Sequence, residues 1–191
     1  MVSSGTPKPA VQVPAAAAAL VDLLNSRPHA TPLLPDTLGD PATSGDVLRL
    51  FGQPEGESPS PERIAQLKVL RSDLMDLVGG PEGQSGKQAW ARLTEHASDV
   101  DLRQSFTPTG QVQLRQVGGD PVVGAVILAV AQLVTDDTWS RIRACANTLC
   151  SHVFYDTTRS RTQRWDSYET CGNRTNVAAH RARARSRASA T

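Results

Sequence analysis

The residues best suited to chemistry in this sequence are three cysteines near its C-terminal end. Cys145 and Cys150 are separated by four residues, and Cys171 follows after twenty more. In a cytosolic protein thiols stay reduced, so clustered cysteines indicate metal ligands or redox groups more than structural disulfides. The spacing fits part of a structural zinc site, which needs about four ligands in a tetrahedral array. Three buried thiols without a metal are the alternative.

Three other residues can supply the missing zinc ligand. Asp166 precedes the third cysteine by five residues, the same interval that separates the first two, and this arithmetic favours it. His152 lies only two residues past the second cysteine, where joining the same tetrahedron would strain the loop. His180 lies nine residues past the third cysteine, over two turns away if the segment is helical.

The charge of the chain changes sign where the cysteines begin. Residues 1–140 carry a net charge of −6 and residues 141–191 one of +7, although the whole chain is at +1. This asymmetry indicates an acidic body with a basic appendage, and basic appendages commonly bind nucleic acid. A solvated, partly disordered arginine tail is the alternative.

Seven arginines are the candidate nucleic-acid contacts. A helix from about Cys171 onward would place Arg174 and Arg181 on one face, where they can follow phosphates or enter a major groove. Scarce aromatic side chains mildly disfavour single-stranded RNA as the target, while RNA and double-stranded DNA both stay open at this point. A structural role for Arg164 and Arg174, bridging Asp156 or backbone carbonyls, stays open. The candidates are Arg159, Arg161, Arg164, Arg174, Arg181, Arg183 and Arg185.

An extended motif surrounds the cysteines. It reads R-x-R-x-C-x4-C, then F-x-D-x-T-R, R-W and C-G-N-R. Its residues are Arg141, Arg143, Cys145, Cys150, Phe154, Asp156, Thr158, Arg159, Arg164, Trp165, Cys171, Gly172, Asn173 and Arg174. Over residues 139–183 the chain thereby resembles the CGNR zinc-finger family, and LVDLLNS at 20–26 with LRSDLMDLV more weakly resembles the family's N-terminal ABATE domain. The resemblance implies a stress-induced transcription regulator whose finger contacts DNA and whose body senses a small-molecule effector or a partner, or forms a homodimer.

One position departs from the family pattern. The family has cysteine after R-W, and this chain has Asp166 there, so the resemblance carries over only three of four cysteine ligands. A carboxylate oxygen can bind zinc, although it is a harder ligand than thiolate. Three alternatives follow. In the first, Asp166 completes the zinc site, and in the second His152 or His180 does. In the third, the module has lost zinc and is held by packing around Phe154, Tyr155, Trp165 and Tyr168.

Upstream of the cysteines the sequence predicts five helices and one hairpin. Ser60, Pro61 and Glu62 supply a cap, a first-turn proline and an acid near the positive end of the helix dipole. The expected helices span 15–26, 43–51, 60–78, 84–97 and 122–134. The last is apolar almost all round, which is typical of a centrally buried helix. Alternation over 101–106 and 111–117 predicts a β-hairpin.

These elements predict a mainly α (α+β) fold with a helical N-terminal domain, one hairpin and a small zinc-finger-like module. The expected parts are a flexible arm at 1–13, an ABATE-like domain at 14–138, a finger module with a basic helix at 139–187 and a tail at 188–191.

The sequence shows no constellation typical of an enzyme. His29 and His96 are isolated, and no glycine-rich loop follows a strand. No apolar run is long enough to span a membrane, and no secretory signal is visible, so we expect a cytoplasmic protein. The main alternative function is a module that binds a small molecule or a protein, in which the finger is purely structural.

Overall fold

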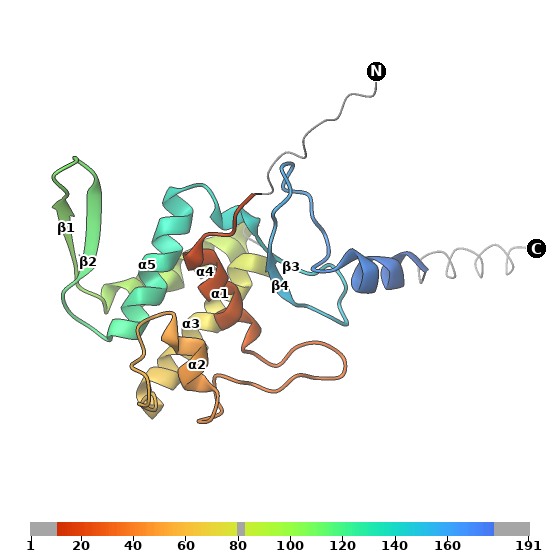
Figure 1. The fold of residues 1–191 in the computed structure, drawn as a ribbon, viewed down its shortest axis with the longest axis horizontal. Helices are drawn as coiled ribbons and strands as arrows, with labels where there is room; N and C mark the ends of the chain where they lie inside the picture. Colours follow the sequence, from red (N-terminus) through yellow and green to blue (C-terminus); the bar gives the residue numbers. More distant parts are fainter. Residues whose placement is uncertain (1–10, 80–82, 178–191) are drawn as a thin grey trace, which may run out of the picture.

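The computed structural model describes residues 11–79 and 83–177. Its elements are α1 (Ala15–Asn25), α2 (Ser44–Arg49), α3 (Pro61–Gly79), α4 (Gly83–Ser98), β1 (Leu102–Phe106), β2 (Val112–Gln116), α5 (Pro121–Thr135), η1 (Trp139–Arg141), β3 (Ile142–Ala144), β4 (Val153–Tyr155) and η2 (Tyr168–Gly172). Helices form the body, the β1–β2 hairpin extends from one end, and the cysteine-bearing module lies at the other (Figure 1). The predicted mainly α, α+β fold is confirmed.

The core of the body lies among α1, α3 and α5. The apolar stripe of α3 is fully buried at Leu67, Leu70, Leu74 and Leu77, and α1 buries Leu20, Leu23 and Leu24. Burial of each such side chain stabilises the folded state by roughly 1.5–3 kcal/mol. None of the helices in the described ranges is long and apolar enough to cross a membrane.

Helix α5 begins with a strong cap. The Asp120 side chain accepts hydrogen bonds from the backbone of Val122 and Val123, and Pro121 occupies the first turn. Arg63 of α3 donates to the same carboxylate at 2.8 Å. The helix is less enclosed than its composition predicts, because Val134 is 46% exposed near its end.

The β1–β2 hairpin pairs Leu102 with Gln116 and Phe106 with Val112, and its strand residues are almost all exposed. The Gln116 side chain ties the hairpin to α5 by donating to the carbonyl of Asp120 at 2.8 Å. A side-chain carbon at Gly124 would collide with that amide, so the Gln116 side chain would have to give up this position.

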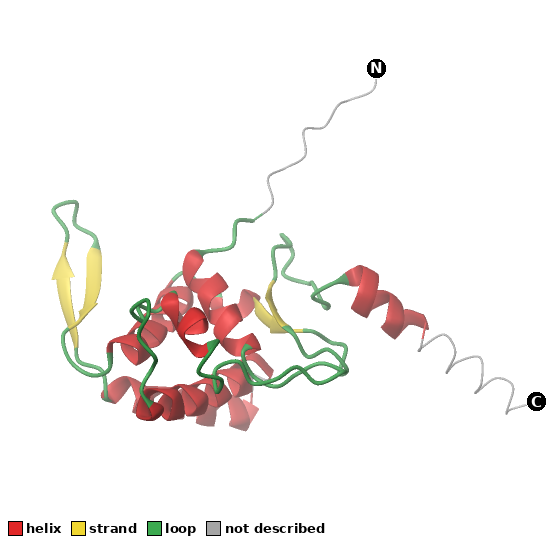
Figure 2. Ribbon diagram, turned by 60° about the horizontal axis from the view of Figure 1, so that its bottom comes forward, coloured by secondary structure: helices red, strands yellow, loops and turns green. Residues whose placement is uncertain are grey.

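A second antiparallel hairpin, β3–β4, was not predicted. It pairs Ile142 with Tyr155 and Ala144 with Val153, at the base of the cysteine module. Ile142, Val153 and Tyr155 are buried in the same apolar core as the helices. Figure 2 shows this hairpin beside the helical body. The apolar core thus continues across residue 139, where the sequence predicts a domain boundary. That boundary stays a prediction.

The end of α1 fastens β4 to the body. The Asn25 amide donates to the Val153 carbonyl and accepts from the Val153 N–H, both at 2.8 Å. Arg27 also donates to the Ser151 carbonyl. The outer edge of β4 is therefore paired by a side chain from a residue more than 120 positions earlier in the chain.

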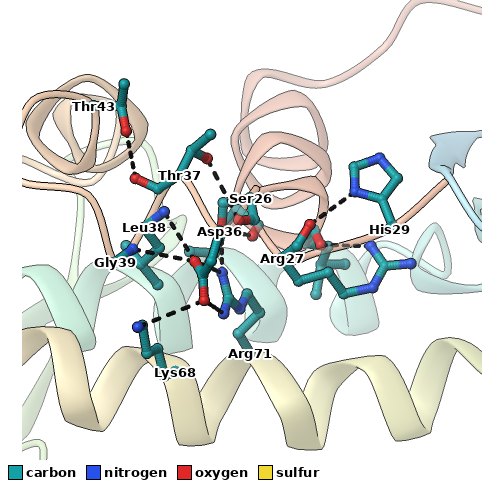
Figure 3. A network of polar contacts seen from close by, with 12 residues as sticks. Ser26, Arg27, His29, Asp36, Thr37, Leu38, Gly39, Thr43, Lys68 and Arg71 are labelled. Atoms are coloured by element: carbon teal, nitrogen blue, oxygen red, sulfur yellow. Dashed lines mark hydrogen bonds and ion pairs between the residues drawn. The ribbon is translucent and has the colours of Figure 1, made fainter. Parts of the chain in front are cut away.

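The loop between α1 and α2 is held by a partly buried ion pair (Figure 3). Asp36 accepts two hydrogen bonds from Arg71 of α3, at 3.0 and 2.9 Å, and Arg71 also donates to Ser26 at 2.7 Å. The hydrogen bond from Arg71 is the main cause that lowers the pKa of Asp36 to about 2. The carboxylate is thus ionised at neutral pH and fixes the path of the loop.

Candidate metal centre

The first two cysteines lie on a tight loop between β3 and β4. Cys145 directly follows β3, and its N–H donates to the His152 carbonyl at 2.8 Å. The Cys150 N–H donates to the Asn147 carbonyl at 2.8 Å, and Ser151 takes a left-handed conformation with φ of 53°. The loop thereby turns both thiols to the same side of the hairpin.

The third cysteine lies on the single turn η2. Ser167 caps this turn by accepting from the Thr170 N–H, and its carbonyl accepts from Cys171 at 2.9 Å. A side-chain carbon at Gly172 would lie 2.7 Å from the Tyr168 ring. Glycine behind Cys171 therefore lets the Tyr168 ring pack against the turn, and a larger residue would displace the ring.

Asp166 joins the three thiols. One ligand atom from each of Cys145, Cys150, Asp166 and Cys171 lies within 4.8 Å of the others. In a tetrahedral zinc site with Zn–S bonds of about 2.3 Å, ligand atoms lie roughly 3.5–4 Å apart, so small shifts suffice for all four to bind one ion.

The Asp166 carboxylate has an oxygen whose hydrogen-bonding capacity is not used. Its Oδ2 accepts from Cys150 at 3.6 Å, but Oδ1 is buried and has no partner among the described groups. A buried oxygen without a partner costs free energy, and a metal ion would remove that cost. The residues present therefore fit a metal ion held by three sulfurs and one oxygen.

The protonation of the cluster follows from its burial. Burial, followed by the nearby Asp166, raises the pKa of Cys145 to about 12 and also raises the pKa of Cys150. Burial opposes ionisation of Asp166 too, but the three thiols gathered around the carboxylate favour its charged form and lower the pKa of this carboxyl. A divalent cation would favour the thiolates that burial disfavours, because metal ligands bind deprotonated.

His152, the first alternative ligand, is engaged elsewhere. Its Nδ1 lies 3.3 Å from His29 Nε2, and its Nε2 lies 3.2 Å from the Asn25 amide nitrogen. Burial is the main cause that lowers the pKa of the His152 ring. His152 belongs to the contact between the body and the module, while His180 lies outside the described residues.

The candidate arginines fall into two groups. Arg159, Arg164 and Arg174 are exposed, and the Arg164 guanidinium lies 5.2 Å from the centre of the Trp165 ring. Arg161 instead donates to Ser140 at 3.0 Å and to Asp137 at 3.1 Å. Arg181, Arg183 and Arg185 lie outside the described ranges, as do the tail at 188–191 and most of the arm at 1–13.

Asp156 organises the loop that carries Arg159 and Arg161. This fully buried carboxylate accepts from the Thr158 N–H and hydroxyl and from the Gln163 N–H. Burial alone would raise the pKa of Asp156, but these hydrogen bonds outweigh it and lower the pKa. The sequence suggested Asp156 as a partner for arginines of the motif, but not these contacts within its own loop.

Two further motif arginines act inside the module. Arg141 donates to the carbonyls of Asp156 and Thr158, both at 2.9 Å. Arg143 donates to the Arg161 carbonyl at 2.7 Å and lies 3.5 Å from the Asp156 carboxylate. The ion-pair partner of Asp156 is thus Arg143, and not Arg164 or Arg174.

Comparison with known families agrees with this geometry. A family model described as CGNR zinc finger matches residues 141–184, which include all four converging residues. The C-terminal module is therefore similar to a known class of metal-binding finger, while the ABATE-like part of the resemblance stays a prediction. No curated protein matches the chain.

Proposed function

We propose that the protein is a cytoplasmic DNA-binding transcription regulator whose C-terminal module holds Zn²⁺ through Cys145, Cys150, Asp166 and Cys171. The observation that carries the proposal is the convergence of these four side chains in a segment similar to the CGNR zinc finger. Bound zinc would join the β3–β4 loop to η2 and so fix the basic surface that lies between them in sequence.

The distribution of arginines supports contact with DNA. Arg141 and Arg143 bond to groups inside the module, whereas Arg159, Arg164 and Arg174 are exposed on its surface. Exposed arginines on a rigid support bind phosphates, which positions a protein on DNA without reading its sequence. The basic residues beyond 177 add positive charge to the same end of the chain.

Binding of labelled genomic DNA fragments across a range of salt concentrations tests this proposal. We expect the zinc-loaded protein to bind, with an affinity that falls steeply as salt rises. Replacing Arg159, Arg164 and Arg174 together by alanine should reduce the slope of log K against log salt by about 2.7, at about 0.9 per phosphate contact.

A matched control replaces Arg103 and Arg115 of the β1–β2 hairpin, which lies at the opposite end of the molecule (Figure 1). Replacing these two arginines should leave the slope of log K against log salt unchanged. Absence of binding to every fragment by zinc-loaded protein contradicts the proposal.

The alternative is a ligand-binding or protein-binding module in which the finger is purely structural. The observation that favours it is the shared core, since Ile142, Val153 and Tyr155 pack with the helices of the body. A protein that binds zinc and folds, but binds no DNA, would support this alternative.

A further inference from the structure

A cleft of about 470 Å³ lies where the helical body meets the cysteine module. The end of α3 and the turn η1 form one side, and β3 with the loop after β4 forms the other. Its lining residues are Leu77, Val78, Trp139, Ser140, Ile142, Arg143, Ala144 and Arg161. Small-molecule sites commonly have volumes of about 300–1,000 Å³ and commonly lie between structural units.

The cleft combines an apolar floor with two guanidinium groups. Trp139 and Ile142 are largely buried residues of the main core at the cleft, and the less buried Val78 and Ala144 also line it. Arg143 and Arg161 come from the module, and both side chains are 37% exposed. An apolar surface beside convergent positive charge is complementary to a small molecule that has an apolar part and an anionic group.

Arg161 is held in an uncommon backbone conformation at the rim. Its φ is 53°, in the left-handed region that side-chain-bearing residues rarely adopt. The guanidinium reaches across to Ser140 and to Asp137, whose side chain is 85% exposed. An ion pair this exposed contributes little free energy, so a ligand carboxylate can replace Asp137 at small cost.

Arg143 retains donors that the protein does not use. Its Nη1 bonds to the Arg161 carbonyl and lies near Asp156, which fixes the side chain. Within the described residues, its Nε and Nη2 have no partner at hydrogen-bonding distance. A guanidinium with two such nitrogens has the geometry for a two-point contact with a carboxylate.

We propose that this cleft binds a small organic carboxylate with an aromatic or branched apolar part. The carboxylate contacts Arg143 and Arg161, and the apolar part lies on Val78, Trp139 and Ile142. This assignment adds a small-molecule site to the proposed regulator and depends on that function only for its regulatory meaning. A ligand here touches α3 of the body and the loop that also carries Arg159, so it connects the two parts directly.

Calorimetric titration of the zinc-loaded full-length protein with 1-naphthoate, in the absence of DNA, tests the assignment. We expect saturable binding of one naphthoate per chain, and binding of the uncharged 1-naphthamide that is at least about tenfold weaker, since only the acid uses the guanidinium groups. Because DNA takes no part, failure of this test and failure of DNA binding are separate results.

Two variants sharpen the test. Arg161→Gly removes the guanidinium but suits a positive φ, so it should fold normally and bind naphthoate about tenfold more weakly. Ala144→Phe fills the cleft from β3 and should also weaken binding. Arg103→Gln, on the distant hairpin, should bind like the unmodified protein, and thermal melting verifies that each variant is folded.

Three results would overturn the assignment. They are equal affinity for the acid and the amide, unchanged affinity in Arg161→Gly, and no naphthoate binding at millimolar concentration. Displacement of naphthoate by inorganic sulfate at equal concentration would also overturn it, because it would indicate a simple anion site that does not use the apolar floor.

Discussion

At the scale of single residues, the carboxylate at position 166 distinguishes this candidate metal centre. Three sulfurs and one oxygen converge there, and the buried Oδ1 of Asp166 has no partner in the described part of the protein. Oxygen is a harder donor than thiolate and matches zinc less well. The site should therefore hold zinc more weakly than the same fold with four sulfurs.

Replacing the carboxylate tests this difference. We expect Asp166→Cys to bind zinc roughly tenfold more tightly, because a softer ligand takes the same position. We expect Asp166→Ala to bind it more weakly than the unmodified protein. Competition with a chromophoric chelator gives the affinities, and the thiolate-to-cobalt charge-transfer band of the Co²⁺ form reports the number of sulfur ligands.

Asp136→Cys is the matched control, since it adds a thiol at an exposed position outside the cluster. It should leave both the affinity and the cobalt spectrum unchanged. Equal zinc affinity in Asp166→Cys, Asp166→Ala and the unmodified protein would mean that position 166 does not bind the ion.

At the scale of elements, contacts between distant segments decide how the module is placed. Asn25, at the end of α1, supplies both a donor and an acceptor to the backbone of Val153 on β4. Val153 is fully buried, so its N–H and carbonyl have no access to water if the amide is removed. The junction therefore depends on a single side chain for two backbone hydrogen bonds.

Asn25→Ala should lower the free energy of unfolding by about 1–3 kcal/mol, the cost of leaving a buried polar group without a partner. Chemical denaturation of the zinc-loaded protein measures this loss, and the Val153 amide should exchange faster with solvent. Asp22→Ala, at an exposed position on the same helix, should change stability by less than about 0.5 kcal/mol. Equal losses in the two variants would exclude the junction as the cause.

The same contacts show what the sequence could predict. Helices α3 and α5 follow from local signals, namely the Ser60-Pro61-Glu62 start, the leucine stripe and the Asp120-Pro121 cap. Strands β3 and β4 have three residues each, too few for a recognisable alternation, and their pairing depends on the cysteine loop between them.

Within the candidate site, spacing and ligand chemistry predicted the four clustered residues, but not the residues that hold them in place. The five-residue interval placed Asp166 beside Cys171, where the structure also has it. The role of Asn25 was not visible, because only folding brings its partner Val153 near. The loop contacts of Asp156 were not predicted either, although Thr158 and Gln163 are close to it in sequence. The engagement of His152 by His29 is of the same kind, since 123 positions separate the two rings.

At the scale of the whole molecule, the metal centre and the helical body are joined by a common core. Ile142, Val153 and Tyr155 belong to the strands that carry the first two cysteines, and they pack among the leucines of the body. Cys145 and Cys171 belong to a smaller cluster with Phe154 on the opposite side of the same hairpin. The packing of the cysteine cluster is therefore connected to the packing of the body through the two short strands β3 and β4.

Removal of the metal should consequently destabilise the entire chain. An ion that binds only the folded state adds RT ln(1 + [L]/Kd), which is about 2.7 kcal/mol when free zinc is a hundredfold above Kd. Calorimetric melting with zinc and with excess chelator should each give one cooperative transition, with a lower Tm in chelator. In a Trp165→Phe background, which removes the tryptophan beside Asp166, the Trp90–Trp139 pair, whose ring centres lie 6.1 Å apart, should report the same shift by fluorescence. Cys171→Ser should melt at a Tm that depends much less on chelator.

Two separate transitions, with the tryptophan signal unaffected by chelator, would instead mean that the finger folds independently and that the shared core does not couple the two parts.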